Sequence, residues 1–117
     1  MRLFLAFLML GAAPAIADPP VIAGAVLHPA GNGYRIDVTL RHPDTGWDHY
    51  ADGWEVLAPD GTRLGFRELM HPHVNEQPFT RSLSGLEIPD GIGKITIRAR
   101  CNVDGWAEAT FTLDVGR

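Results

Sequence analysis

Apolar and polar residues alternate along most of this chain, and the alternation limits the folds that it can adopt. Residues 94–103 read "KITIRARCNV", with isoleucine, alanine, cysteine and valine at every second position and polar or charged residues between them. Residues 34–41 and 107–115 show the same pattern. Because successive side chains of a strand point to opposite faces, this period of two predicts half-buried β-strands. We find no convincing helical pattern.

Turn residues separate the alternating runs. The motifs are "PAGNG" at 29–33, "PDG" at 59–61, "IPDGIG" at 88–93 and "DGW" at 104–106. They predict hairpins that join 21–28 to 34–40, 54–58 to 64–68, and 94–103 to 107–115, with a weaker strand at 80–86. Seven short strands in about 100 residues favour an antiparallel, immunoglobulin-like β-sandwich. The expected large core side chains are Tyr34, Trp54, Phe66 and Phe111.

Cys101 is the one cysteine of the chain, so no internal disulfide can stabilise the sandwich. Its side chain is therefore buried, a metal ligand, or paired with another molecule. The alternation of 94–103 places it on the same face as Ile95 and Ile97, which favours a small buried side chain.

The N-terminus has the pattern of a secretory signal peptide. Arg2 precedes an apolar run, and "GAAPAIA" ends in the A-x-A arrangement of Ala15 and Ala17. We expect a signal peptide at 1–17, a single domain at 18–117, a periplasmic or secreted location, and no membrane insertion after cleavage. Loss of Arg2 changes the net charge from −4 to −5, with 9 basic against 14 acidic residues. An acidic chain without a basic face is a poor nucleic-acid or anionic-membrane partner.

Two connections, 42–53 and 70–79, are longer than hairpins need and hold four of the five histidines. Loops of this length often carry function. We expect them to fold toward each other and form a binding surface for an unknown protein or small molecule. Its candidate residues are Trp47, His49, Tyr50, His71, His73 and Phe79.

The motif "HPH" at 71–73 suggests a metal site in this surface. The proline holds its neighbours extended, so both imidazoles point roughly the same way. The candidate ligands are His49, His71 and His73, supplemented by Asp48, Glu76 or Met70, and imidazole-rich sites suit copper or zinc. The alternative is a loop without a cofactor, organised by hydrogen bonds around His71, Glu76, Gln77 and Arg81, with Phe79 in the core.

Residues 47–92, and "HPHVNEQPFTRS" at 71–82 above all, resemble the central block of a family of small, secreted, uncharacterised bacterial proteins. The resemblance implies an exported, single-domain β protein and no particular reaction. Members of that family carry a histidine where this chain has Asp104, and a residue other than cysteine at position 101.

A second resemblance is to superoxide reductases, immunoglobulin-like sandwiches in which histidines and one cysteine bind a mononuclear iron. An "HP" pair and "CNVDGW" carry it. The resemblance implies iron ligands at His71 and Cys101. Gln77 and Asp104 occupy positions where further histidines would be expected.

Sequence motifs of common enzymes are absent: there is no G-x-S-x-G, no H-E-x-x-H and no glycine-rich phosphate loop. We therefore predict a protein that is not an enzyme. The first hypothesis is an exported binding module, and the second is an exported copper or zinc binding protein.

Overall fold

The computed structural model describes residues 18–117, and the predicted signal peptide at 1–17 lies outside the described residues. The described chain forms eight strands and no helix. The strands are β1 (Val21–Ala30), β2 (Gly33–Arg41), β3 (Ala51–Leu57), β4 (Arg63–Glu68), β5 (Phe79–Leu86), β6 (Lys94–Cys101), β7 (Gly105–Trp106) and β8 (Phe111–Asp114).

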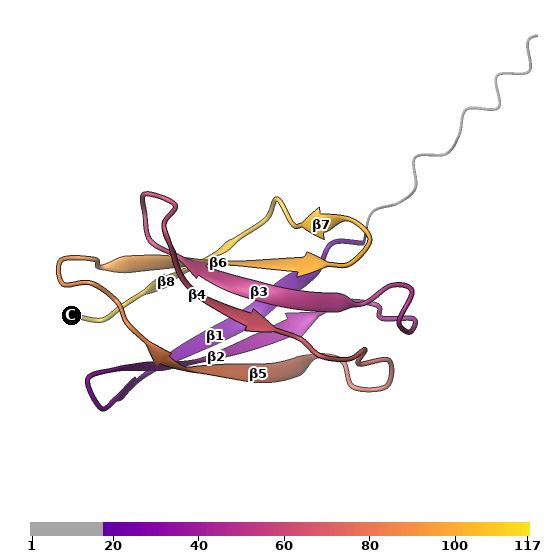
Figure 1. The fold of residues 1–117 in the computed structure, drawn as a ribbon, viewed down its shortest axis with the longest axis horizontal. Helices are drawn as coiled ribbons and strands as arrows, with labels where there is room; N and C mark the ends of the chain where they lie inside the picture. Colours follow the sequence, from indigo (N-terminus) through magenta and orange to yellow (C-terminus); the bar gives the residue numbers. More distant parts are fainter. Residues whose placement is uncertain (1–17) are drawn as a thin grey trace, which may run out of the picture.

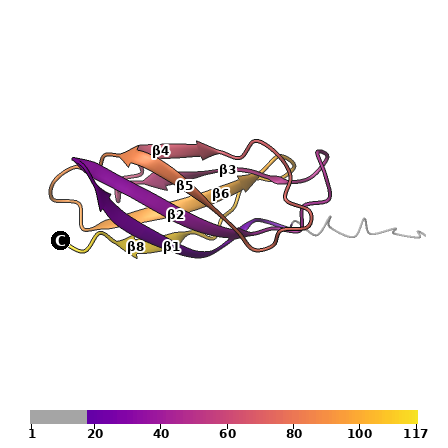
Figure 2. The ribbon, with the colours of Figure 1, turned by 90° about the horizontal axis from the view of Figure 1, so that it is seen from below.

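The strands form two antiparallel sheets that pack as a sandwich (Figures 1 and 2). One sheet has the order β1-β2-β5, and the other has the order β4-β3-β6-β7, with β8 also paired to β6. This arrangement confirms the predicted antiparallel β-sandwich without a disulfide. The one strand that the sequence did not predict is β7, which is two residues long and pairs with the end of β6.

The alternating residues of the inner strands form the core between the sheets. Ile36, Val38 and Leu40 of β2 are fully buried, as are Trp54 and Val56 of β3. The inward-facing residues of β6, which are also buried in the core, are Ile95, Ile97, Ala99 and Cys101. Burial of each large side chain contributes about 1.5–3 kcal/mol, and this packing takes the place of the missing disulfide.

Phe66 is a correction to the predicted core, because its side chain is 38% exposed. The inward position of β4 is Gly65, where a β-carbon would lie only 2.7 Å from a methyl group of Leu83 in the opposite sheet. The sheets are too close there for a large residue. Phe66 points outward and packs edge-on against Trp106, with ring centroids 6.3 Å apart. Tyr34 and Phe111 are partly buried against the core.

The edges of the two sheets meet along the length of the sandwich. Figure 2 shows β4 beside β5 at one edge and β1 beside β8 at the other, and both pairs are in contact. Within residues 18–117, we find no helix that is long and apolar enough to span a bilayer.

The core assignment predicts unequal effects of two aromatic truncations. Trp54→Ala should lower the free energy of unfolding by about 3–5 kcal/mol, because it leaves a large cavity in the core. Phe66→Ala should lower it by less than about 1.5 kcal/mol, because the ring is already partly hydrated. Urea unfolding of both variants measures the difference, and equal losses would contradict the assignment.

Candidate metal centre

Three connections gather at one end of the sandwich (Figure 1). They are the β2–β3 connection at 42–50, the β4–β5 connection at 69–78, and the short turn at 102–104 between β6 and β7. The predicted meeting of the two long connections is therefore observed, and the turn after Cys101 joins them.

The buried carboxylate of Asp44 ties the two long connections together. Its Oδ1 accepts hydrogen bonds from the backbone N–H of Ala51 at 3.0 Å and from Nδ1 of His42 at 2.5 Å. Its Oδ2 accepts one from the backbone N–H of His73 at 2.7 Å. The carboxylate thus has three donors from both connections, and a buried charge needs such partners.

Gln77 makes a second link between the same connections. Its side-chain oxygen accepts the backbone N–H of His42 at 3.0 Å, and its side-chain nitrogen donates to the carbonyl of His73 at 2.9 Å. Asn102 attaches the third element, the β6–β7 turn. The backbone N–H of Tyr50 donates to its Oδ1 at 2.9 Å, and its Nδ2 donates to the carbonyl of Trp47 at 3.0 Å.

A tight turn brings His49 back toward the sheets. The N–H of His49 donates to the carbonyl of Gly46, and the N–H of Thr45 donates to the carbonyl of His49 at 3.0 Å. Gly46 has a φ of +146°, a backbone conformation that a residue with a β-carbon rarely adopts. The glycine therefore permits the turn that places the His49 ring beside β6.

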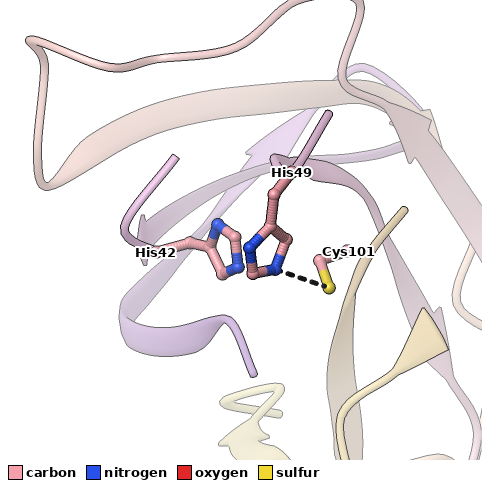
Figure 3. A group of neighbouring side chains, drawn as sticks. All are labelled: His42, His49 and Cys101. Carbon is pink, nitrogen blue, oxygen red and sulfur yellow. Dashed lines mark hydrogen bonds between the residues drawn. The ribbon is translucent and has the colours of Figure 1, made fainter. Parts of the chain in front are cut away.

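His42, His49 and Cys101 converge at this end of the sandwich (Figure 3). One donor atom from each residue, a ring nitrogen or the sulfur, lies within 4.8 Å of the other two. The two rings pack edge to face with centroids 4.7 Å apart, and Nε2 of His49 is 3.6 Å from the Cys101 sulfur. Within residues 18–117, no separate group of three or more histidine, cysteine, aspartate or glutamate side chains has its donor atoms this close together.

His42 has a buried ring that is bound to a carboxylate through one nitrogen. Its side chain is fully buried, and the bond to Asp44 occupies Nδ1. Its Nε2 is buried and has no hydrogen-bond partner among the described residues. Ligating histidines commonly donate their other ring N–H to a carboxylate, which fixes the tautomer and the ring orientation. A metal ion would satisfy the free nitrogen.

Asp104 supplies a fourth donor on the solvent side. Its Oδ2 lies 3.6 Å from the Cys101 sulfur and 3.9 Å from Nε2 of His49. The backbone N–H of Asp104 donates to the sulfur at 3.2 Å. Gly105, at a φ of +73°, lets the chain turn back directly after this residue.

The donor set fits a single transition-metal ion. Bonds of about 2.0 Å to imidazole and about 2.3 Å to sulfur place the ligand atoms roughly 3.3–3.8 Å apart. The separation of 3.6 Å between His49 and Cys101 already lies in this range. The widest pair has to approach by about 1 Å, a small side-chain adjustment. Two imidazoles, a thiolate and a carboxylate suit zinc or copper.

Access to the centre is from the Asp104 side. An open hollow of about 590 Å³ lies next to this carboxylate, lined by Pro19, Asp104, Trp106, Ala107, Glu108 and Ala109. The side chains of His49 and Asp104 are 24% and 34% exposed, whereas His42 and Cys101 are fully buried. An ion would therefore enter past Asp104.

His71 and His73 form a separate cluster. The ring of His73 stacks on Phe79 with centroids 4.0 Å apart, and its centroid lies 4.6 Å from that of His71, with the two planes tilted by 35°. The guanidinium of Arg81 lies 2.8 Å from Nε2 of His73 and donates to Glu76 at 3.1 Å. These contacts match the predicted hydrogen-bonded loop around Glu76, Gln77 and Arg81, with Phe79 buried in the core.

The remaining predicted site residues lie at the surface of the same end. Trp47 is 65% exposed, and its ring contacts Tyr50 edge-on at 5.6 Å.

The assembled trio contains one of the three predicted metal ligands, His49. His42 was not among the predicted ligands, and it directly follows the strand that ends at Arg41. Cys101 was predicted to be a core residue. Cys101 is fully buried, as predicted, but its sulfur lies where β6 ends. The "HP" histidine that the structure groups with Cys101 is His42 rather than His71.

Comparison with known proteins identifies one informative relative. The chain is 39% identical over 84 residues to a protein of Halomicrobium mukohataei named "Putative lipoprotein". The matched region covers 72% of this chain and 41% of the relative, so the chain spans less than half the length of that protein. No protein-family model matches the chain, and no solved structure matches it.

Asp44 predicts a large stability effect. Asp44→Ala should lower the free energy of unfolding by about 3–5 kcal/mol, because it leaves buried donors of both connections without an acceptor. Chemical denaturation measures the loss. Asp48→Ala is the matched control, since this exposed aspartate of the same connection should change stability by less than about 0.5 kcal/mol. Similar losses in both variants would contradict the role of Asp44.

His73 predicts a loss of stability in weak acid. Burial lowers the pKa of His73, and the nearby Arg81 and His71 lower it further, against the opposing effects of Glu76 and Asp44. As the pH falls, the unfolded chain therefore takes up a proton at His73 at a higher pH than the folded chain does. The free energy of unfolding should decrease as the pH drops below about 6.5. Denaturation at several pH values should show a weaker acid loss in His73→Gln. An unchanged pH dependence in that variant would contradict this prediction.

Proposed function

We propose that this is an exported, non-catalytic protein that binds one copper or zinc ion through His42, His49 and Cys101, with Asp104 as the fourth ligand. The observation that carries the proposal is the buried, unpartnered Nε2 of His42, beside a second imidazole and a thiol. An orphaned buried nitrogen is costly unless it has a function or an unseen partner.

The second layer around the site supports the same proposal. Asp44 fixes the ring of His42, the backbone N–H of Asp104 donates to the sulfur of Cys101, and Asn102 holds the connection that carries His49. These contacts orient the donors before an ion arrives, which reduces the entropy lost on binding.

Two observations support export. Residues 1–17 have the composition of a signal peptide. The relative from Halomicrobium mukohataei is named as a lipoprotein, which is consistent with a location in or beyond the cell envelope. A metal site with one thiolate is compatible with an oxidising compartment, because the sulfur is fully buried.

A second candidate function is the binding of a partner by the same end of the sandwich. Four exposed apolar side chains lie on its three connections, with exposed fractions between 50% and 65%: Trp47, Met70, Val74 and Val103. Exposed apolar groups that gather in this way mark interaction surfaces.

Metal titration tests the proposed ligands. Calorimetry of the reduced, metal-free protein with Zn(II) should show one site per chain, and Co(II) should give the visible bands of a thiolate complex. We expect Cys101→Ser to remove the sulfur-dependent Co(II) bands. Asp44→Asn should weaken binding by about 10–100-fold, because it loosens the ring of His42.

His71→Ala is the control for this titration, since it removes an imidazole from the other cluster. It should leave Zn(II) affinity unchanged. Weak binding that is insensitive to Cys101→Ser would refute the proposed centre. Loss of affinity in His71→Ala with normal affinity in Cys101→Ser would favour the set His49, His71 and His73 instead.

A further inference from the structure

The donor set includes the ligand types of a redox-active copper centre. Two imidazoles and one thiolate lie close together, and the fourth donor, Asp104, is 3.6–3.9 Å from two of them on the open side. Zinc prefers four comparable ligands in a tetrahedron. The same set contains the two histidines and one cysteine that bind copper in centres that transfer electrons.

Two of the three ligands, His42 and Cys101, are held by hydrogen-bonded elements. Cys101 ends β6, whose neighbour β3 pairs with it through Ala51. His42 is fully buried and bound to Asp44, whose other contacts connect both long loops. A ligand cage that keeps its geometry lets copper change oxidation state with little rearrangement, because the same donors serve both states.

The centre reaches the surface at His49. Its side chain is 24% exposed, while the other two ligands are fully buried. Two exposed apolar side chains flank this point: Trp47 at 65% and Val103 at 59%. Asn102 holds them on the same patch, since it precedes Val103 and donates to the carbonyl of Trp47. We call Trp47, His49 and Val103 the His49 patch.

The charge around the His49 patch indicates the kind of partner. Asp48 is exposed beside Trp47, Asp104 follows Val103, and the whole chain carries a net charge of −4. A partner that docks here should present an apolar surface ringed by basic side chains, since complementary charges speed encounter.

We propose that the centre binds copper and passes single electrons through the His49 patch to a basic one-electron carrier protein. This inference rests on the proposed metal site. In the reaction, Cu(I) loses one electron and becomes Cu(II), while the acceptor gains that electron. The Cys101 thiolate and both imidazoles keep their protonation, so no bond is broken and no proton moves.

The first test is spectroscopic and electrochemical. The purified protein loaded with Cu(II) should show an intense thiolate-to-copper band in the visible region and a reversible one-electron couple in voltammetry. The band should disappear in Cys101→Ser and persist in His71→Ala. Irreversible reduction of Cu(II), with oxidation of Cys101, would overturn the proposal of electron transfer. If the same preparation still binds Zn(II), the proposed metal site is unaffected by that result. Failure to bind either ion would overturn both proposals.

The second test concerns the docking surface. The Cu(I) protein is mixed in a stopped-flow instrument with an oxidised basic c-type cytochrome, and reduction of the haem is followed. Val103→Lys places a positive charge in the patch, which repels the positive charges of the basic partner. It should slow the reaction by about tenfold or more, without a change in the visible band. Added salt should also slow the reaction of the unmodified protein, since the attraction is electrostatic.

Val26→Lys is the matched control. It is the same substitution at a valine that is 54% exposed in β1 of the other sheet. Its rate should equal that of the unmodified protein. Equal slowing by both substitutions, or no slowing by Val103→Lys, would overturn the assignment of the His49 patch as the docking surface.

Discussion

The carboxylate of Asp44 is the interaction on which the arrangement of this end of the sandwich depends. A charged group buried between loops is unfavourable unless several donors surround it. Asp44 receives hydrogen bonds from Ala51, from the ring of His42 and from the backbone of His73. Two connections far apart in the sequence can satisfy it only by folding together. The same contacts leave Nε2 of His42 as the free nitrogen of that ring, facing away from the carboxylate.

The two histidine clusters differ because of what surrounds each ring. Near Asp44, His42 and His49 have a thiol and a second carboxylate beside them, so their nitrogens are available as ligands. His73 instead lies between aromatic rings and beside the guanidinium of Arg81. Burial holds its pKa down, Arg81 lowers the pKa further, and the guanidinium occupies its Nε2. Nδ1 of His73 is also buried without a partner, but His73 belongs to no group of three ligand side chains among the described residues. The exposed Trp47 and Val103 border the first cluster.

The sequence predicted the sandwich well because period-two alternation and turn residues are local signals. The core face of β6, including the burial of Cys101, followed from that alternation alone. Its extension to Val103 was wrong, because β6 ends at Cys101 and Val103 lies in the following turn, 59% exposed. The outward direction of Phe66 did not, since it depends on how closely Gly65 approaches Leu83 in the other sheet. The meeting of the long connections was predicted from their length. Their ligand set was not, because His42, His49 and Cys101 are brought together by tertiary hydrogen bonds that no spacing in the sequence reveals.

X-ray absorption at the zinc edge of the Zn(II)-loaded protein tests the central claim most directly, because it reports the ligand atoms themselves. The proposed centre predicts one sulfur at about 2.3 Å together with nitrogen or oxygen neighbours at about 2.0 Å, including the outer-shell scattering of two imidazoles. A spectrum without a sulfur neighbour, or with the scattering of three imidazoles, would contradict a site built from His42, His49 and Cys101.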